Sequence, residues 1–307
     1  IDPNFFLGGR MSLDAGAARK VIQEIATQVN MDIEETAAGI LEIAGEQMIK
    51  AIQEITVQDG VNPAESILVA GGGAAGLNIL PIAQSLGCSR VLLPKTAGAL
   101  SACGGHYSDI VSEYSASRYS ASDDFDFEGV STIFDEITRK LDAEQKSLKE
   151  RGITKFSREF FVEARYLNQQ WEMEFKIPMS RVENSEDVEK LIEEFHTVHF
   201  RRYAVKEEGG VIECINWKGR LIAELAKPPH AQVDATNTSE ILPGRTVSAY
   251  FSGHGKCETS VYMGGQLPVN CYIAGPAIIE EPTTTVVVYP GAQASVSSGG
   301  HYLISFS

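Results

Sequence analysis

A run of small residues is the part of the sequence whose residue types and spacing point most directly to chemistry. Residues 71–76 read Gly-Gly-Gly-Ala-Ala-Gly and directly follow the apolar residues 67–70. Glycine adopts positive φ angles and lets a ligand or a neighbouring helix come close to the main chain. The run is therefore typical of a loop that contacts a nucleotide and equally of a loop that packs tightly, and the pattern leaves both interpretations open.

The spacing of this run fits one known nucleotide motif only in part. Gly71, Gly73 and Gly76 match G-x-G-x-x-G, but a dinucleotide site also needs an acidic residue about twenty positions on, at the end of the next strand. That strand ends in Pro94-Lys95 instead. A P-loop is excluded because no Gly-Lys-Ser/Thr follows the run. Lys95 leaves the carboxyl end of a predicted parallel strand, where α/β proteins bind ligands, so it is a candidate phosphate contact or a solvated loop lysine.

Two histidines have a spacing that metal sites use. His196 and His199 are three residues apart on a predicted helix over 185–203, with acidic residues nearby. No third ligand is evident close in sequence, so we interpret them as one buried and one solvated histidine of a helix face and predict no metal site.

Paired carboxylates are a further candidate. Glu280 and Glu281 are adjacent on a predicted strand and should point to opposite faces, which separates them. Glu172 and Glu174 should share a face, but the one exposed to water. No Ser-His-Asp or Cys-His set can be asserted, and the catalytic residues stay unassigned.

The elements that position the glycine run form a predicted βαβ unit. Residues 67–70 and 90–94 are short apolar runs typical of strands buried on both faces, and a short helix lies between them. Strands joined in this way should be parallel. Two helices are predicted before the unit, over 17–28 and from 32–34 to about 55. Gly39 and Gly45 interrupt the second helix at a cost of roughly 1 kcal/mol each, which suggests close packing.

The composition changes after this region, and we place a domain boundary at 115/116. Beyond it we predict helices over 129–150 and 185–203, an antiparallel hairpin over 158–177 with Trp171 and Met173 on its apolar side, and a long strand over 211–225. A proline-bearing link over 226–245 and a series of short strands complete the chain. The expected fold is an α/β portion over 1–115 followed by an α+β domain over 116–307 that is rich in strands at its end.

Composition excludes several classes of partner. The chain has 307 residues, 43% of them hydrophobic, and a formal net charge of −15. Such an acidic surface repels phosphate backbones and anionic lipid, so we expect neither nucleic-acid nor membrane binding. No apolar run is long enough for a membrane span. Five cysteines, none spaced as CxxC, argue against a disulfide framework and indicate a reducing, cytoplasmic location.

Taken together, the motifs resemble those of the hydantoinase A/oxoprolinase family. The similar segments are "DPNFFLGGRMSLD", "ETAAGILEIAGEQMIKAIQEIT", "ILVAGGGAAG", "VLLP", "AGALSACG", "ARYLNQQWEMEF", "FHTVHFRRYAV" and "GPAIIEEPTTTVVVYPG". They occur in family order and cover essentially the whole chain.

The resemblance implies the tail of an ATPase core of the actin, sugar-kinase and chaperone fold. It places a nucleoside against the glycine run, and the residues expected to contact ATP are Gly71, Gly72, Gly73, Ala74, Gly76 and Lys95. Family members use ATP either to hydrolyse cyclic amides or to carboxylate ketones, and in both cases phosphorylation of an amide or enol oxygen would create a good leaving group. The proline and histidine that usually follow the family's glycine loop are absent here.

The resemblance also implies that essential parts lie outside these residues. The family's two Asp-Gly-Gly-Thr phosphate loops, with their Mg²⁺-orienting aspartates, do not occur in residues 1–307, and the chain begins without Met. We therefore expect the C-terminal part of a subunit, inactive alone, that needs an upstream half or a split N-terminal subunit, and a hydantoinase B-like partner, in an oligomer. The alternatives are a subunit of an ATP-dependent ketone carboxylase and a non-catalytic scaffold.

Overall fold

The computed structural model describes residues 2–229 and 241–306. The chain forms two compact units: residues up to 105 together with those from 229 onward, and residues 106–228. The predicted link over 226–245 lies partly outside the described residues. Each unit has its own core and is described by itself.

The first unit begins with two helices, as predicted. α1 (Ala15–Val29) starts at Asp14, whose carboxylate accepts a hydrogen bond of 2.9 Å from the Ala17 N–H, and α2 spans Ile33–Gln58. A Cβ built on Gly45 would lie 3.9 Å from Ile82, whereas one built on Gly39 would meet no atom within 4 Å. The Gly45 distance is an ordinary van der Waals contact, so the close packing expected at these two glycines is found at neither position.

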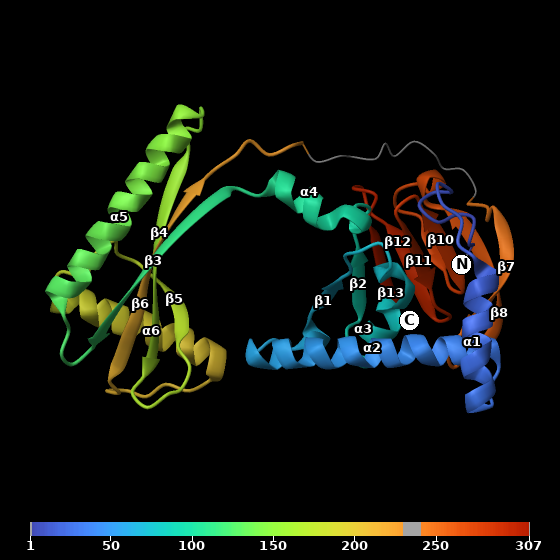
Figure 1. The fold of residues 1–307 in the computed structure, drawn as a ribbon, viewed down its shortest axis with the longest axis horizontal. Coiled ribbons are helices and arrows are strands. Elements are labelled where there is room, and N and C mark those ends of the chain that lie inside the picture. The colour runs from blue at the N-terminus through green and yellow to red at the C-terminus, as the bar shows by residue number, and fades with distance from the viewer. Residues whose placement is uncertain (1, 230–240, 307) are drawn as a thin grey trace. The chain divides into compact units, whose positions relative to one another are not determined.

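A five-stranded mixed sheet, ordered β1-β2-β13-β12-β9, forms the centre of this unit (Figure 1). β1 and β2 are parallel and are joined by the helix α3, which confirms the predicted βαβ unit, while β2 pairs antiparallel with β13. The elements are β1 (Ile67–Val69), α3 (Ala75–Ser85), β2 (Arg90–Leu93), β9 (Tyr272–Ala274), β12 (Ala292–Val296) and β13 (Tyr302–Phe306).

The two strands of the βαβ unit are less buried than the sequence predicted. β1 is the edge strand of the sheet, and Ile67 and Val69 are 44% and 54% exposed. In β2, Val91 and Leu93 are fully buried while Arg90 is exposed. The prediction of strands buried on both faces was therefore wrong, because an apolar run of four residues does not reveal whether its strand lies at an edge.

A second, four-stranded sheet packs into the same core. Its order is β11-β10-β8-β7, with β8 and β10 parallel and the other pairs antiparallel. The strands are β7 (Arg245–Phe251), β8 (Gly255–Met263), β10 (Ala277–Glu281) and β11 (Thr284–Val288). Buried residues of β2, α3, β10, β11 and β13 share one cluster that includes Leu93, Leu80, Ile279, Val286 and Ile304.

The compact units group the residues differently from the expected division at 115/116. The residues from 245 onward belong to the same compact unit as residues up to 105, because β13 supplies the neighbour that β2 needs on its open side. Residues 106–115 belong to the other unit, because they lead into and begin the long strand β3 (Ile110–Ala121). Between the glycine run and this strand lie the short helices η2 (Ala97–Ala99) and α4 (Leu100–Tyr107).

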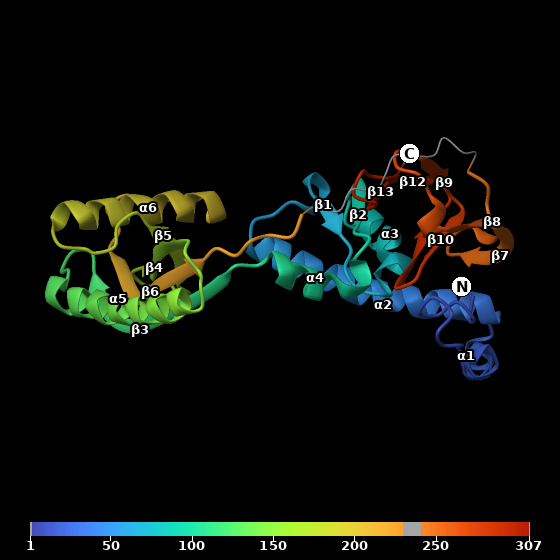
Figure 2. The same ribbon diagram turned by 90° about the horizontal axis from the view of Figure 1, so that it is seen from above.

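The second unit is an antiparallel sheet, ordered β3-β6-β4-β5, and the helices α5 and α6 pack on one of its faces (Figure 2). Their aromatic contacts fix the core: the rings of Phe134 on α5 and Trp217 on β6 are 5.5 Å apart, and those of Phe195 on α6 and Phe175 on β5 are 5.6 Å apart. The elements are α5 (Phe127–Glu150), β4 (Phe156–Tyr166), β5 (Met173–Ile177), α6 (Ser185–Tyr203) and β6 (Ile212–Ala223).

Most predictions for this unit are confirmed, including both helices, the hairpin and the long strand. Met173 and Phe175 are buried as expected, but Trp171 lies before the start of β5 and is 78% exposed. The alternation that predicted its burial does not extend into the turn.

No helix in the described part of the chain combines the length and apolar composition that a membrane span needs.

Candidate functional site

Two loops meet at one edge of the five-stranded sheet. The glycine loop, residues 70–76, follows β1, and a second loop, residues 94–99, follows β2. Because β1 and β2 are parallel neighbours, their carboxyl ends share an edge of the sheet. The Gly72 N–H donates a hydrogen bond of 2.7 Å to the Ala97 carbonyl and ties the loops together. The structure thus brings the predicted glycine and Lys95 segments side by side.

Packing explains part of the glycine content of these loops. Gly76 is buried, and a Cβ at this position would overlap the Thr285 carbonyl oxygen. A Cβ on Gly73 would lie 3.1 Å from the Thr283 carbonyl oxygen, and one on Gly98 would lie 2.7 Å from the Thr283 side chain. A larger residue would not fit at these positions, because the turn between β10 and β11 and the start of β11 lie directly against them.

The other side of the glycine loop is open. Gly71, Gly72, Gly73 and Ala74 are exposed, and Gly72 has a φ of +119° with no atom within 4 Å of a built Cβ. The loop leads directly into α3, whose N-terminus carries partial positive charge and N–H groups without intrahelical partners. This surface suits a ligand that presents flat or anionic groups to main-chain atoms.

Lys95 lies where the sequence placed it. Its side chain is exposed, on the loop that follows β2. Its backbone N–H donates a hydrogen bond of 3.2 Å to Nδ1 of His301, which directly precedes β13. The main chain at this position is held, while the ammonium group is free to reach a ligand.

Two residues that the sequence did not single out form hydrogen bonds to the backbone of the two loops. The Thr284 hydroxyl donates a hydrogen bond of 3.0 Å to the Gly73 carbonyl, and His301 accepts the bond from Lys95. Thr284 is 211 residues from Gly73 and His301 is 206 residues from Lys95. No local pattern could have found them, because only the pairing of β13 with β2 and the packing of β11 bring them close.

Both histidines of α6 have hydrogen-bond partners within the second unit. His196 Nδ1 lies 2.6 Å from the Tyr166 hydroxyl, and His199 Nδ1 lies 2.8 Å from the Val205 carbonyl. Both histidines are buried, which corrects the expectation of one solvated histidine: α6 turns both toward Tyr166. Burial lowers the pKa of His196, and nearby Lys206 adds to this effect. Within the described residues, no group of three or more His, Cys, Asp or Glu side chains is placed to hold a metal ion.

The adjacent glutamates of β10 have separate partners, as their alternation predicted. Arg245 donates hydrogen bonds of 3.0 and 2.5 Å to Glu280, and the Tyr302 hydroxyl donates one of 2.5 Å to Glu281. Both carboxylates are buried. Burial and the Glu281 carboxylate raise the pKa of Tyr302, so its hydroxyl stays protonated and donates. These glutamates stabilise the strand and do not form a paired site.

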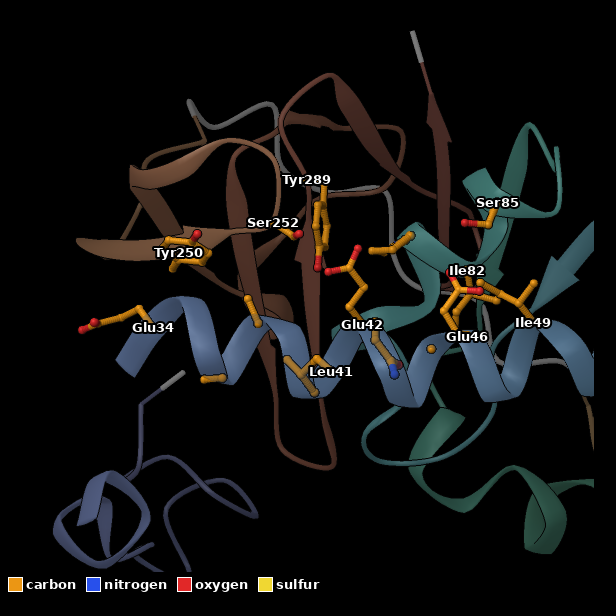
Figure 3. Close-up of a pocket in the computed structure, with 15 residues that line it drawn as sticks. Glu34, Leu41, Glu42, Glu46, Ile49, Ile82, Ser85, Tyr250, Ser252 and Tyr289 are labelled. Atoms are coloured by element: carbon orange, nitrogen blue, oxygen red, sulfur yellow. The ribbon is translucent and has the colours of Figure 1, made fainter. Parts of the chain in front are cut away.

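A cavity of about 280 Å³ lies on another side of the same unit, between α2, α3 and the β7–β8 sheet (Figure 3). Its floor is apolar, with Leu41 and Ile82, and in Figure 3 Glu42 reaches from α2 toward Tyr289. Glu34 and Glu46 add further carboxylates, and the described lining contains no Lys, Arg or His. Such a lining repels phosphate groups, so this cavity is a poor candidate for the polyphosphate end of a nucleotide.

Comparison with known proteins identifies the class. A family model for hydantoinase/oxoprolinase matches residues 1–114, and the model for the hydantoinase/oxoprolinase C-terminal domain matches residues 126–304. The chain therefore belongs to the hydantoinase/oxoprolinase family. The two models meet near the boundary expected from sequence, although the compact units divide the chain differently.

Individual relatives agree with this assignment. The chain is 28% identical over 302 residues to the caprolactamase subunit alpha of Pseudomonas jessenii, with 96% of this chain and 43% of that protein covered. It is 27% identical to the acetophenone carboxylase gamma subunit of Aromatoleum aromaticum, with 98% and 42% covered. The crystal structure of the ATP-dependent caprolactamase from P. jessenii superimposes with a TM-score of 0.79 at 27% identity, over 98% of this chain and 44% of that chain. The chain thus spans about two fifths of the length of these relatives.

Proposed function

We propose that this chain is the C-terminal part of an ATP-dependent amidohydrolase subunit of the hydantoinase/oxoprolinase type. The observation that carries the proposal is a likeness to an ATP-dependent caprolactamase that extends over 98% of the chain with a TM-score of 0.79. The substrate class is a cyclic amide. Transfer of the ATP γ-phosphoryl group to the amide oxygen turns an unreactive carbonyl into one with a good leaving group.

In this proposal the open glycine loop contacts the nucleoside. Gly71, Gly72, Gly73 and Ala74 are exposed, Gly72 has open space next to its Cα, and Gly76 lets α3 start close to the sheet. The Lys95 ammonium supplies positive charge at the same edge. These groups bind and orient ATP, and the ligands of its Mg²⁺ belong to a part of the protein outside these residues. Residues 1–307 by themselves then do not turn over ATP.

Exposed apolar side chains support the presence of further polypeptide around the first unit. They gather on α1, on α2 and on the edge strand β1. The set is Val21, Ile25, Val29, Leu41, Ile43, Ile55, Val57, Ile67 and Val69. We propose that an upstream half of the same subunit, or a split N-terminal subunit, covers them, and that a hydantoinase B-like subunit completes the enzyme. The free cysteines suit a reducing compartment such as the cytoplasm.

Two other functions have specific support. The similarity to the acetophenone carboxylase gamma subunit favours a ketone carboxylase as the second candidate, because that relative is matched over 98% of this chain. A non-catalytic scaffold is the candidate of another class. It is supported by the fact that packing against Thr283 and Thr285 explains Gly73 and Gly76 without any ligand.

The decisive experiment is ATP binding and turnover by the complete protein that contains this chain, together with its partner subunit. We expect micromolar to millimolar ATP affinity in calorimetry, and ATP hydrolysis stimulated by lactams. Turnover stimulated only by a ketone with bicarbonate would favour the carboxylase, and absence of ATP binding would favour the scaffold. Lys95→Ala should raise the KM for ATP about three- to tenfold, whereas Lys20→Ala on α1 should leave it unchanged.

A further inference from the structure

The glycine loop is exposed on one side and packs on the other side against residues 283–285, which lie more than 200 positions later in the chain. The turn Pro282–Thr283 and the first residues of β11 lie against the two loops, and three glycines make room for them. A Cβ on Gly73 would lie 3.1 Å from the Thr283 carbonyl, one on Gly98 would lie 2.7 Å from the same carbonyl, and one on Gly76 would overlap the Thr285 carbonyl. Backbone atoms do not move aside easily, so the loop and this turn fit each other in only one arrangement.

Two side-chain hydrogen bonds fix the loops to this backing. The Thr284 hydroxyl donates to the Gly73 carbonyl over 3.0 Å, and Thr284 is 5% exposed, so water competes little for the bond. His301 Nδ1 accepts the Lys95 N–H over 3.2 Å. One bond holds the loop after β1, and the other holds the loop after β2. The Gly72-to-Ala97 bond of 2.7 Å then locks the two loops to each other.

We infer that Thr284 and His301 are positioning residues for the glycine loop and the Lys95 loop. Residues matched by the C-terminal family model would then complete an ATP site whose loops belong to the segment matched by the first family model. This inference rests on the proposed function. Neither side chain touches the nucleotide. They set the backbone conformation of Gly73 and Lys95 before ATP arrives, so that less conformational entropy is lost when it binds.

The test uses matched variants of the complete protein. Thr284→Val keeps the shape of the side chain and removes the donor, and Thr284→Ser keeps the hydroxyl. His301→Leu removes the acceptor, and His301→Asn places an amide oxygen near the position of Nδ1. Thr285→Val is the control. The same change is made at the next position of β11, where the threonine side chain makes no hydrogen bond among the described residues, unlike that of Thr284.

Hydrogen exchange measures the positioning directly and does not require ATP. Thr284→Val should raise amide exchange in residues 70–77 at least fivefold, and His301→Leu should do the same in residues 94–99. Thr284→Ser, His301→Asn and Thr285→Val should exchange like the wild type, as should β12 in every variant. Equal exchange in Thr284→Val and the wild type would overturn the inference. The serine and asparagine variants separate loss of the bond from general misfolding.

ATP binding measures the functional consequence. The Kd and the KM for ATP should rise about five- to tenfold in Thr284→Val, which corresponds to the loss of one hydrogen bond's contribution, while kcat changes less than twofold. Faster loop exchange with unchanged ATP affinity would overturn the nucleotide part of the inference. A wild-type protein that binds no ATP would instead refute the proposed function, and the exchange data would still decide whether Thr284 and His301 hold the loops.

Discussion

At the scale of single residues, neighbouring glycines are present for different physical reasons. Gly76 is buried against the Thr285 carbonyl and has no room for a side chain, whereas Gly72 adopts a φ of +119° in open space. Gly39 in α2 meets neither condition. The residue type is the same in each case, but the cost of replacing it depends on what lies next to the missing Cβ.

This difference predicts opposite effects of two alanine substitutions. Gly76→Ala should lower the free energy of unfolding by about 2 kcal/mol or more, because the new methyl group overlaps a backbone oxygen. Gly39→Ala should raise it by up to about 1 kcal/mol, because alanine is the better helix former and the site is open. Urea unfolding measures both. A stable Gly76→Ala protein would show that the β11 strand can move away from the loop.

The buried histidine predicts a pH dependence. The pKa of His196 lies below its ordinary value of 6.5, so the unfolded chain binds a proton more readily than the folded one. The stability it contributes is complete above pH 6.5 and is lost as the pH falls through the folded pKa. We expect the free energy of unfolding to fall as the pH is lowered from 7.5 to 5.5. His196→Asn should be less stable than the wild type, and its free energy of unfolding should depend less on pH in this range. An unchanged pH dependence in this variant would show that His196 is not its source.

At the scale of elements, the second unit places its apolar and its charged side chains on opposite faces of one sheet. The helices cover one face. On the other, Lys218 of β6 bridges Glu163 of β4 and Glu174 of β5, and Arg220 also reaches Glu174. The Lys218 side chain is only 16% exposed, so this network is shielded from water far more than a surface ion pair.

Removing the shared cation should therefore be costly. Burial opposes ionisation of Glu163 and Glu174, but hydrogen bonds from Lys218, helped by Asn216 and Arg220, outweigh it and hold both pKa values below the ordinary 4.5. Their contribution to stability is present above pH 4.5 and is lost as the pH falls through the folded pKa values.

Lys218→Met should lower the free energy of unfolding by about 2 kcal/mol at pH 7 and shift acid unfolding to higher pH. The matched control is Lys190→Met, whose partner Glu186 is four residues away on exposed helix surface, and its effect should stay below about 0.5 kcal/mol. Unfolding curves across pH measure both, and equal effects would show that the sheet network is no stronger than a surface pair.

At the scale of the whole molecule, the chain leaves its first unit, forms the second, and returns. Residues 106–228 have their own core, whereas the first unit is built from both ends of the sequence. Both tryptophans, Trp171 and Trp217, lie in the second unit. Trp217 is fully buried, so tryptophan fluorescence reports on the unfolding of this unit alone.

This organisation predicts that residues 106–228 fold in isolation and that residues 1–105 do not. The first fragment should unfold cooperatively with the fluorescence change of Trp217. The second lacks β13, which pairs with β2, and lacks the strands that complete its core. Circular dichroism and amide exchange measure both. A well-folded fragment of residues 1–105 would contradict the shared core.

The sequence by itself determined the local elements and the family. The period of the apolar residues determined α1, α2 and α6, and the alternation in 158–177 determined the hairpin, because these patterns depend on neighbours within one turn or one strand. It also determined that glycines follow a strand and that Lys95 follows the next one. Trp171 was misplaced where the alternation ran into a turn.

Only the tertiary structure decided which segments share a core. The pairing of β2 with β13 connects residues more than 200 positions apart, and no local pattern encodes which strand completes a sheet. The same pairing places His301 next to the Lys95 loop and joins residues from 245 onward to the beginning of the chain, and the packing of β11 places Thr284 next to the glycine loop. These properties depend on long-range packing, which is a property of the folded chain as a whole.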